Sequence, residues 1–167
     1  MNLFKNKIAD IFLRGISVGL IAGTVKDIPD LFLVLLWRVK KVAFWEYVSQ
    51  ICLHMKPNNF IEHLIAFSIQ VVFSLGLGII YSMVIVPKIS TRHYLLRGVL
   101  YGTSCWFILI SSLEFYKITP VLTDDVVTPV LTLVFSAFYG LLLAYLDKNW
   151  APGNSSLDHS KQPKRVK

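Results

Sequence analysis

The 167-residue chain has few charged residues. Asp, Glu, Lys and Arg make up 16% of it, against about 25% in ordinary soluble domains, while hydrophobic residues make up 54%. The charges are absent from several long blocks and concentrated between them, a pattern typical of membrane proteins. We therefore predict an all-α integral membrane protein, because a helix satisfies its own backbone polar groups inside lipid.

The sequence also lacks the short motifs of well-known catalytic and metal sites. Its two cysteines, Cys52 and Cys105, form neither a CxxC pair nor a zinc-binding spacing. There is no P-loop, no dinucleotide-binding glycine fingerprint, no serine nucleophile elbow and no HExxH. We accordingly predict no catalytic residue, no metal and no cofactor, and a protein that is not an enzyme.

Long apolar runs dominate what is present. Three of them are free or nearly free of charge, and each has about the 20 residues that cross a bilayer as a helix. A less regular run near the N-terminus gives a fourth, uncleaved span. The helix of the last span is expected to begin with an N-cap and an acidic first turn at Thr123, Asp124 and Asp125. The prediction is a four-helix membrane domain over residues 1–148, with spans at about 9–27, 64–86, 95–115 and 126–146.

The first run is interrupted by Lys26, Asp27 and Asp30 around Pro29. A charge at a helix centre costs about 2.5–3.5 kcal/mol of insertion free energy, more than the following apolar residues can offset. We therefore expect the first span to end near residue 27, at the outer membrane edge, and Pro29 to begin a new helix. That helix, about residues 30–54, is predicted to lie at the interface. Its apolar stripe is Phe44, Tyr47, Val48, Ile51 and Met55.

The positive charge indicates which way the chain is inserted. The net charge is +7, and the Lys and Arg residues lie at the ends of the apolar runs and in a basic tail, 149–167, predicted to be disordered. With both termini in the cytoplasm, eleven of the 17 Lys and Arg residues lie on the cytoplasmic side, as the positive-inside rule requires. This placement favours the lipid bilayer as partner and argues against nucleic acid.

Small residues recur four positions apart on every predicted span. In lipid, helices associate through close packing of such residues, so a compact bundle is expected. Packing within the chain is the favoured interpretation, with a homo-oligomer or a membrane protein partner left open. The residues are Gly15, Gly19, Gly23, Ser74, Gly78, Ser82, Gly98, Gly102, Ser136, Gly140 and Ala144.

Several of these positions also carry a family resemblance. The matching blocks are Gly19–Gly23 followed by Lys26 and Asp27, Phe73–Tyr81 followed by Pro87, Gly98–Gly102 leading to Trp106, and Tyr139–Gly140 before Ala144. Over most of residues 12–148 the chain resembles the YagU/YqhR-like group of small bacterial membrane proteins. The resemblance implies the bacterial inner membrane, four spans and no established reaction. The basic, aromatic segment 30–56 departs from that group, whose members carry a proline-rich stretch there.

The best candidate for a functional site is the polar cluster of Lys26, Asp27 and Asp30, with Arg14 deeper in the same helix. Ionisable residues at membrane depth are functional candidates by default. The competing interpretation is a membrane-edge cluster in which Lys26 pairs with Asp30, while Arg14 pairs with Asp10 at i−4.

Three functions remain open at this stage. The favoured one is a structural or interaction role in the cytoplasmic membrane. The alternative is a small permease or channel subunit that acts as an oligomer, with the candidate polar cluster near its path. A lipid-modifying enzyme is the weakest of the three.

Overall fold

The computed structural model describes residues 10–35, 42–88, 93–115 and 126–151. These residues form helices and no strands, so the prediction of an all-α chain is confirmed for this part of the protein. The elements are α1 (Ile11–Leu35), α2 (Phe44–Leu53), α3 (Phe60–Ile80), the π-helical turn η1 (Tyr81–Ile85), α4 (Val86–Lys88), α5 (Tyr94–Phe115) and α6 (Val127–Trp150).

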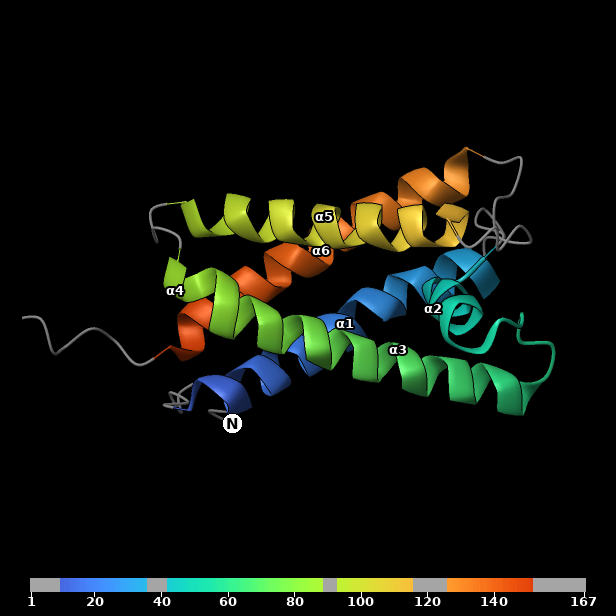
Figure 1. Cartoon of the computed structure of the whole chain (residues 1–167), viewed down its shortest axis with the longest axis horizontal. Helices are drawn as coiled ribbons and strands as arrows, with labels where there is room; N and C mark the ends of the chain where they lie inside the picture. Colours follow the sequence, from blue (N-terminus) through green and yellow to red (C-terminus); the bar gives the residue numbers. More distant parts are fainter. Residues whose placement is uncertain (1–9, 36–41, 89–92, 116–125, 152–167) are drawn as a thin grey trace, which may run out of the picture.

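Four long helices lie along the long axis of the molecule and alternate in direction (Figure 1). Helix α1 packs against α3 and α6, and α5 packs against α6. The short helix α2 lies at the end of the bundle where α1 ends and α3 begins. The start of α1 and the end of α6 lie together at the opposite end.

Three helices of the described chain are long and apolar enough to cross a membrane: Phe60–Ile85, Tyr94–Phe115 and Val127–Trp150. They agree with three predicted spans and make this a candidate multi-pass membrane protein. Helix α1 has 25 residues, or about 37 Å of helix, which is sufficient length. Its four charged side chains lower its hydropathy, so its crossing of the membrane stays a prediction.

The prediction that Pro29 begins a new helix is wrong. Helix α1 continues through Pro29 to Leu35. The prediction assumed that the nearby charged side chains face lipid. Their insertion free energy would then have required the helix to end before Pro29. Instead the side chains of Lys26, Asp27 and Asp30 are buried against other helices, so the cost is largely offset by contacts within the protein.

The segment 30–54, predicted as one interfacial helix, therefore contributes to two separate helices. Its first residues belong to α1, and α2 covers only Phe44–Leu53. Phe44, Tyr47 and Val48 of the predicted stripe are buried with Leu109 and Leu113 of α5. The stripe thus packs onto the bundle, and only its last member, Met55, is exposed.

Small residues bring α1 and α3 into backbone contact. A Cβ atom added at Gly19 would lie 2.6 Å from the carbonyl oxygen of Ser74, and one at Gly15 would lie 2.8 Å from Cα of Ile79. A Cβ at Gly23 would lie 2.7 Å from Cβ of Ser74. Only glycine fits at these positions, because any side chain would push the two helices apart.

The second close seam joins α5 and α6. Gly98 and Gly140 face each other so closely that a Cβ on either would overlap the carbonyl oxygen of the other. Gly102 faces the carbonyl of Ser136 in the same way, and Ala144 lies beside Gly98. The small residues singled out from the sequence thus lie on two seams inside the chain, apart from Ser82, which takes a polar role described below.

The π turn η1 follows from Pro87. A proline ring clashes with the carbonyl group four residues earlier, and a local π turn is one way for a helix to make room. Here the N–H of Val86 bonds to the carbonyl of Tyr81, five residues back. The wider turn leaves Tyr81 and Ser82 with no exposed surface.

The C-terminal boundary also differs from prediction. The tail was expected to begin at residue 149, but α6 runs to Trp150. Trp150 is 7% exposed and packs in the same core cluster as Leu146, which holds the last turn in place. Residues 152–167, and the predicted cap at Thr123, Asp124 and Asp125, lie outside the described residues.

Candidate functional site

Lys26 and Asp27 form a buried ion pair in the second half of α1. The Lys26 Nζ atom lies 2.8 Å from Oδ1 of Asp27, and the two side chains are 2% and 5% exposed. Adjacent residues of a helix point in different directions. The pair therefore requires the long lysine side chain to reach back across the helix surface, toward the packed interface with α2 and α3.

Asp30 links this pair to α2. Its Oδ2 accepts a hydrogen bond of 2.8 Å from the backbone N–H of Phe44, the first residue of α2. Ala43, at the N-cap position, has no side chain that could do this, so α1 caps α2 from outside. The Phe44 ring in turn lies under Lys26, with 3.3 Å from Nζ to the ring centroid, a cation–π contact.

A small cavity of about 20 Å³ adjoins Lys26 between the helices of the bundle. This volume accommodates one water molecule. Polar groups from three helices line it together with aromatic side chains. The polar lining residues are Lys26, Gln70, Ser74, Ser136 and Tyr139.

The side chain of Gln70 has a hydrogen-bond acceptor at the cavity that lacks a partner among the described residues. Its side chain is 1% exposed; its Nε2 donates to Oγ of Ser74 at 3.3 Å, but no described residue donates to its Oε1. Tyr139 donates from its hydroxyl to the carbonyl of Ser74 at 2.8 Å. A buried acceptor of this kind usually has a water partner, and the cavity has room for one.

The cavity lies near the middle of the helices. Gln70 is ten residues after the start of α3, or about 15 Å along it, and fifteen residues before the end of η1. A hydrocarbon core is about 30 Å thick. Lys26 thus reaches the central part of a bundle whose α3, α5 and α6 could cross a membrane.

A second buried ion pair lies toward the other end of the bundle. Nε of Arg14 donates to Oδ1 of Asp147 at 2.9 Å, and the hydroxyl of Ser82 donates to the same oxygen at 2.7 Å. The predicted pairing of Arg14 with Asp10 is wrong. Asp10 instead caps α1 by accepting from the N–H of Phe12 at 2.8 Å. Asp10 is used in this cap because the backbone N–H groups at the start of a helix have no partner within the helix. Asp147 can reach Arg14 because α6 packs on α1.

Aromatic hydroxyls lie between the two ion pairs. The Tyr101 hydroxyl donates to the carbonyl of Leu77 at 2.7 Å, and its ring centroid lies 5.2 Å from that of Tyr81. Arg97 is only 9% exposed and lies with its guanidinium carbon 5.8 Å from the centre of the Tyr81 ring. Polar groups are therefore distributed along much of the bundle interior.

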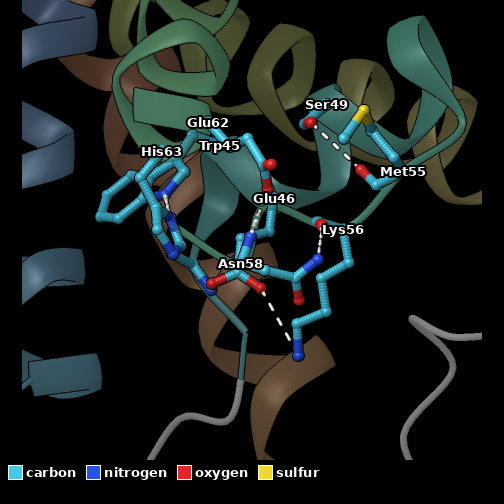
Figure 2. Close-up of polar contacts among 9 residues, drawn as sticks. Trp45, Glu46, Ser49, Met55, Lys56, Asn58, Glu62 and His63 are labelled. Carbon is cyan, nitrogen blue, oxygen red and sulfur yellow. Dashed lines mark hydrogen bonds and ion pairs between the residues drawn. The ribbon is translucent and has the colours of Figure 1, made fainter. Parts of the chain in front are cut away.

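An open groove adjoins the pair on its other side. It has a volume of about 290 Å³ and lies between α1, α3 and α2. Asp27 contributes to its wall, whereas Lys26 lines the small cavity. Figure 2 shows the corner between α2 and α3 beside it, where Nε1 of Trp45 donates to Nδ1 of His63 at 3.3 Å.

The corner itself is stabilised by helix capping. Asn59 accepts from the N–H of Glu62 at 2.9 Å, and Glu62 accepts from the N–H of Asn58 at 2.7 Å. Figure 2 shows Lys56 beside Glu46, with 3.8 Å between Nζ and Oε2. These polar groups orient the turn that leads into α3. No group of three His, Cys, Asp or Glu side chains that could hold a metal occurs in the described ranges.

The candidate polar cluster thus splits into two sites. Lys26, Asp27 and Asp30 lie together, while Arg14 is twelve residues earlier on α1, about 18 Å away along the helix. Sequence reasoning missed Gln70 and Asp147 as partners. A signal for Gln70 exists in the sequence, because it is the one amide in the uncharged run 64–86. Asp147 resembled an ordinary membrane-interface residue.

Comparisons with protein-family models, with curated proteins and with solved structures find no match. The resemblance to the YagU/YqhR-like group therefore stays a prediction. The function has to be argued from the geometry of the chain itself.

Proposed function

We propose that the protein is a small permease that passes protons across the membrane, with the Lys26–Asp27 pair as its central exchange site. The observation that carries this proposal is the position of the pair. Lys26 lines a small cavity at mid-bundle, and its partner Asp27 lines a larger, more open groove. Ionisable groups at membrane depth are costly and are typical of ion pathways and proton relays.

The proposed path continues from the cavity toward the second ion pair. Beyond Lys26 it passes Gln70 and Tyr139, then Tyr101 and Tyr81, and ends at the site formed by Arg14, Ser82 and Asp147. Each of these is a titratable or hydrogen-bonding side chain on an inward-facing part of its helix. Hydroxyl groups both donate and accept hydrogen bonds, as a relay requires.

The exchange step moves one proton at a time. Protonated Lys26 releases a proton from Nζ to a water molecule in the cavity, and the Asp27 carboxylate takes a proton from a water molecule on the groove side. The resulting carboxyl group of Asp27 then passes that proton to the neutral amine of Lys26, which restores the ion pair. Each step transfers one proton between two named groups, so neither an oxidant nor a further reactant is needed.

The test is proton flux into liposomes that contain the purified protein, driven by an imposed potential. The wild type should acidify the lumen faster than empty liposomes, and Asp27→Asn should remove the difference. Glu62→Gln is the matched control, because Glu62 is an acidic residue at the surface end of α3. If wild-type liposomes are no leakier than empty ones, the proposal is wrong.

A second candidate is the structural or interaction role favoured by the sequence. The close glycine seams support it, as does the small size of the cavity beside Lys26, about 20 Å³. A protein of this kind would show no flux, and its Lys26–Asp27 pair would act only in folding. The flux experiment therefore separates the two candidates.

We also propose four spans with both termini in the cytoplasm, in the cytoplasmic membrane. The alternation of the four long helices and the common end shared by the start of α1 and the end of α6 support this arrangement (Figure 1). The positive-inside rule supports its orientation.

A further inference from the structure

The groove between α1, α2 and α3 has mainly apolar walls. Its volume of about 290 Å³ is far larger than that of the cavity beside Lys26. Aromatic and aliphatic side chains make up most of the lining, and Asp27 and His63 are its ionisable members. The lining residues are Thr24, Asp27, Ile28, Leu31, Trp45, Phe60, His63, Leu64 and Phe67.

The Asp27 carboxylate does not make this groove a cation site. Its Oδ1 lies 2.8 Å from Nζ of Lys26, and the side chain is only 5% exposed. The pair has no net charge, so a cationic ligand would have to compete with Lys26 for the same oxygen. A neutral apolar occupant fits the walls better.

The groove is continuous with the surface that would face lipid. Phe60 and Leu64 line it from α3, a candidate membrane span, and they are 80% and 55% exposed. Ile28 of α1, on the opposite wall, is 52% exposed. In the proposed membrane arrangement, apolar surface of this extent on such a helix contacts hydrocarbon, so lipids are the molecules that reach the groove.

The α2 side of the groove carries a polar rim. His63 accepts from Nε1 of Trp45 at its Nδ1 atom, so the neutral ring carries its proton on Nε2. That N–H is a donor of the type that pairs with ester or phosphate oxygens. Tryptophan itself is enriched at the level of lipid headgroups.

From these observations we propose that the groove binds one acyl chain of a membrane phospholipid, with the polar part of the lipid beside Trp45 and His63. The chain would lie between α1 and α3 along the apolar lining. A bound chain would share the groove through which Asp27 takes up protons in the proposed function and would slow that step, but lipid binding itself requires only that the protein is in a membrane.

Quenching of Trp45 fluorescence by brominated acyl chains tests the proposal. A variant with Trp37→Phe, Trp106→Phe and Trp150→Phe retains Trp45 as its single tryptophan. It would be reconstituted in phosphatidylcholine vesicles with and without bromine on the acyl chains. Although Trp45 is only 9% exposed, a chain in the groove should quench it strongly.

A filled groove provides the decisive comparison. Thr24→Phe places a ring into the groove and should abolish most of the quenching. Thr103→Phe on α5 is the matched control, because both threonines bond back to a carbonyl of their own helix and only Thr24 lines the groove. The control variant should be quenched like the parent.

Two results would overturn the proposal. One is a Trp45 signal that brominated chains do not quench, which means that protein or water occupies the groove. The other is quenching that persists in Thr24→Phe, which means that Trp45 meets bulk lipid directly. If Thr24→Phe fails to fold by circular dichroism, Leu64→Phe fills the same groove from α3 and gives the same comparison.

Discussion

Lys26 and Asp27 are adjacent in the sequence, yet they line different spaces while Nζ and Oδ1 remain 2.8 Å apart. The lysine adjoins the small cavity, and the aspartate adjoins the more open groove. The ion pair therefore lies between the cavity inside the bundle and the groove on its surface.

Removing one member of the pair should destabilise the protein more than removing both. Lys26→Met leaves a buried carboxylate without its cation, which costs about 3–5 kcal/mol of unfolding free energy. Lys26→Met combined with Asp27→Leu removes both charges and should recover most of that loss, because apolar replacement of buried pairs is often near neutral. Equilibrium unfolding in mixed detergent measures both values. A double variant no more stable than the single one contradicts the pairing.

The glycine seams make a prediction with an internal control. A Cβ at Gly102 would overlap the carbonyl of Ser136, whereas a Cβ at Gly76 meets nothing within 4 Å. Gly102→Ala should therefore lower the unfolding free energy by about 1–3 kcal/mol, as overpacking does. Gly76→Ala should be neutral or stabilising by up to about 1 kcal/mol, because alanine favours helix. Equal losses at the two positions would show that the α5–α6 seam is misplaced.

Arg14 should be energetically coupled to Asp147 and not to Asp10. Asp147→Ala leaves the guanidinium buried without its partner and should cost about 3–5 kcal/mol. Asp10→Ala removes a helix cap and should cost about 1 kcal/mol. Double-mutant cycles with Arg14→Met measure the coupling. A coupling energy at Asp10 as large as that at Asp147 would restore the pairing expected from sequence.

Topology can be read from cysteine labelling in intact cells. In a background without Cys52 and Cys105, a cysteine at Asn58 should react with an impermeant reagent, because the α2–α3 corner lies at the outer end of the proposed topology. Cysteines at Asp10 and Pro87, both exposed at the opposite end, should react only after the cells are opened. Labelling of position 10 from outside would contradict the orientation.

Much of the fold follows from sequence patterns with a single physical cause. The predicted spans at 64–86 and 95–115 correspond to α3 with η1 and to α5, because long apolar runs have one stable form in lipid. The glycines at 15, 19, 98 and 102 lie on helix seams, because only very small residues allow such close contact.

The candidate site was predicted only in part, because its partners come from distant segments. Periodicity showed that Lys26 and Asp27 were unusual, but it could not show that Phe44 and Gln70 would surround them. The insertion cost assigned to the charges assumed contact with lipid. Burial against α2 and α3 changed that cost and allowed α1 to pass through Pro29.

The measurement that tests the account most directly is proton flux into liposomes for the wild type and for the combined Lys26→Met and Asp27→Leu variant, each checked for stability beforehand. The account predicts that the wild type conducts protons and that the variant, although folded, conducts no faster than empty liposomes. Equal flux in the two proteins would contradict it, because the Lys26–Asp27 pair would then have no part in conduction.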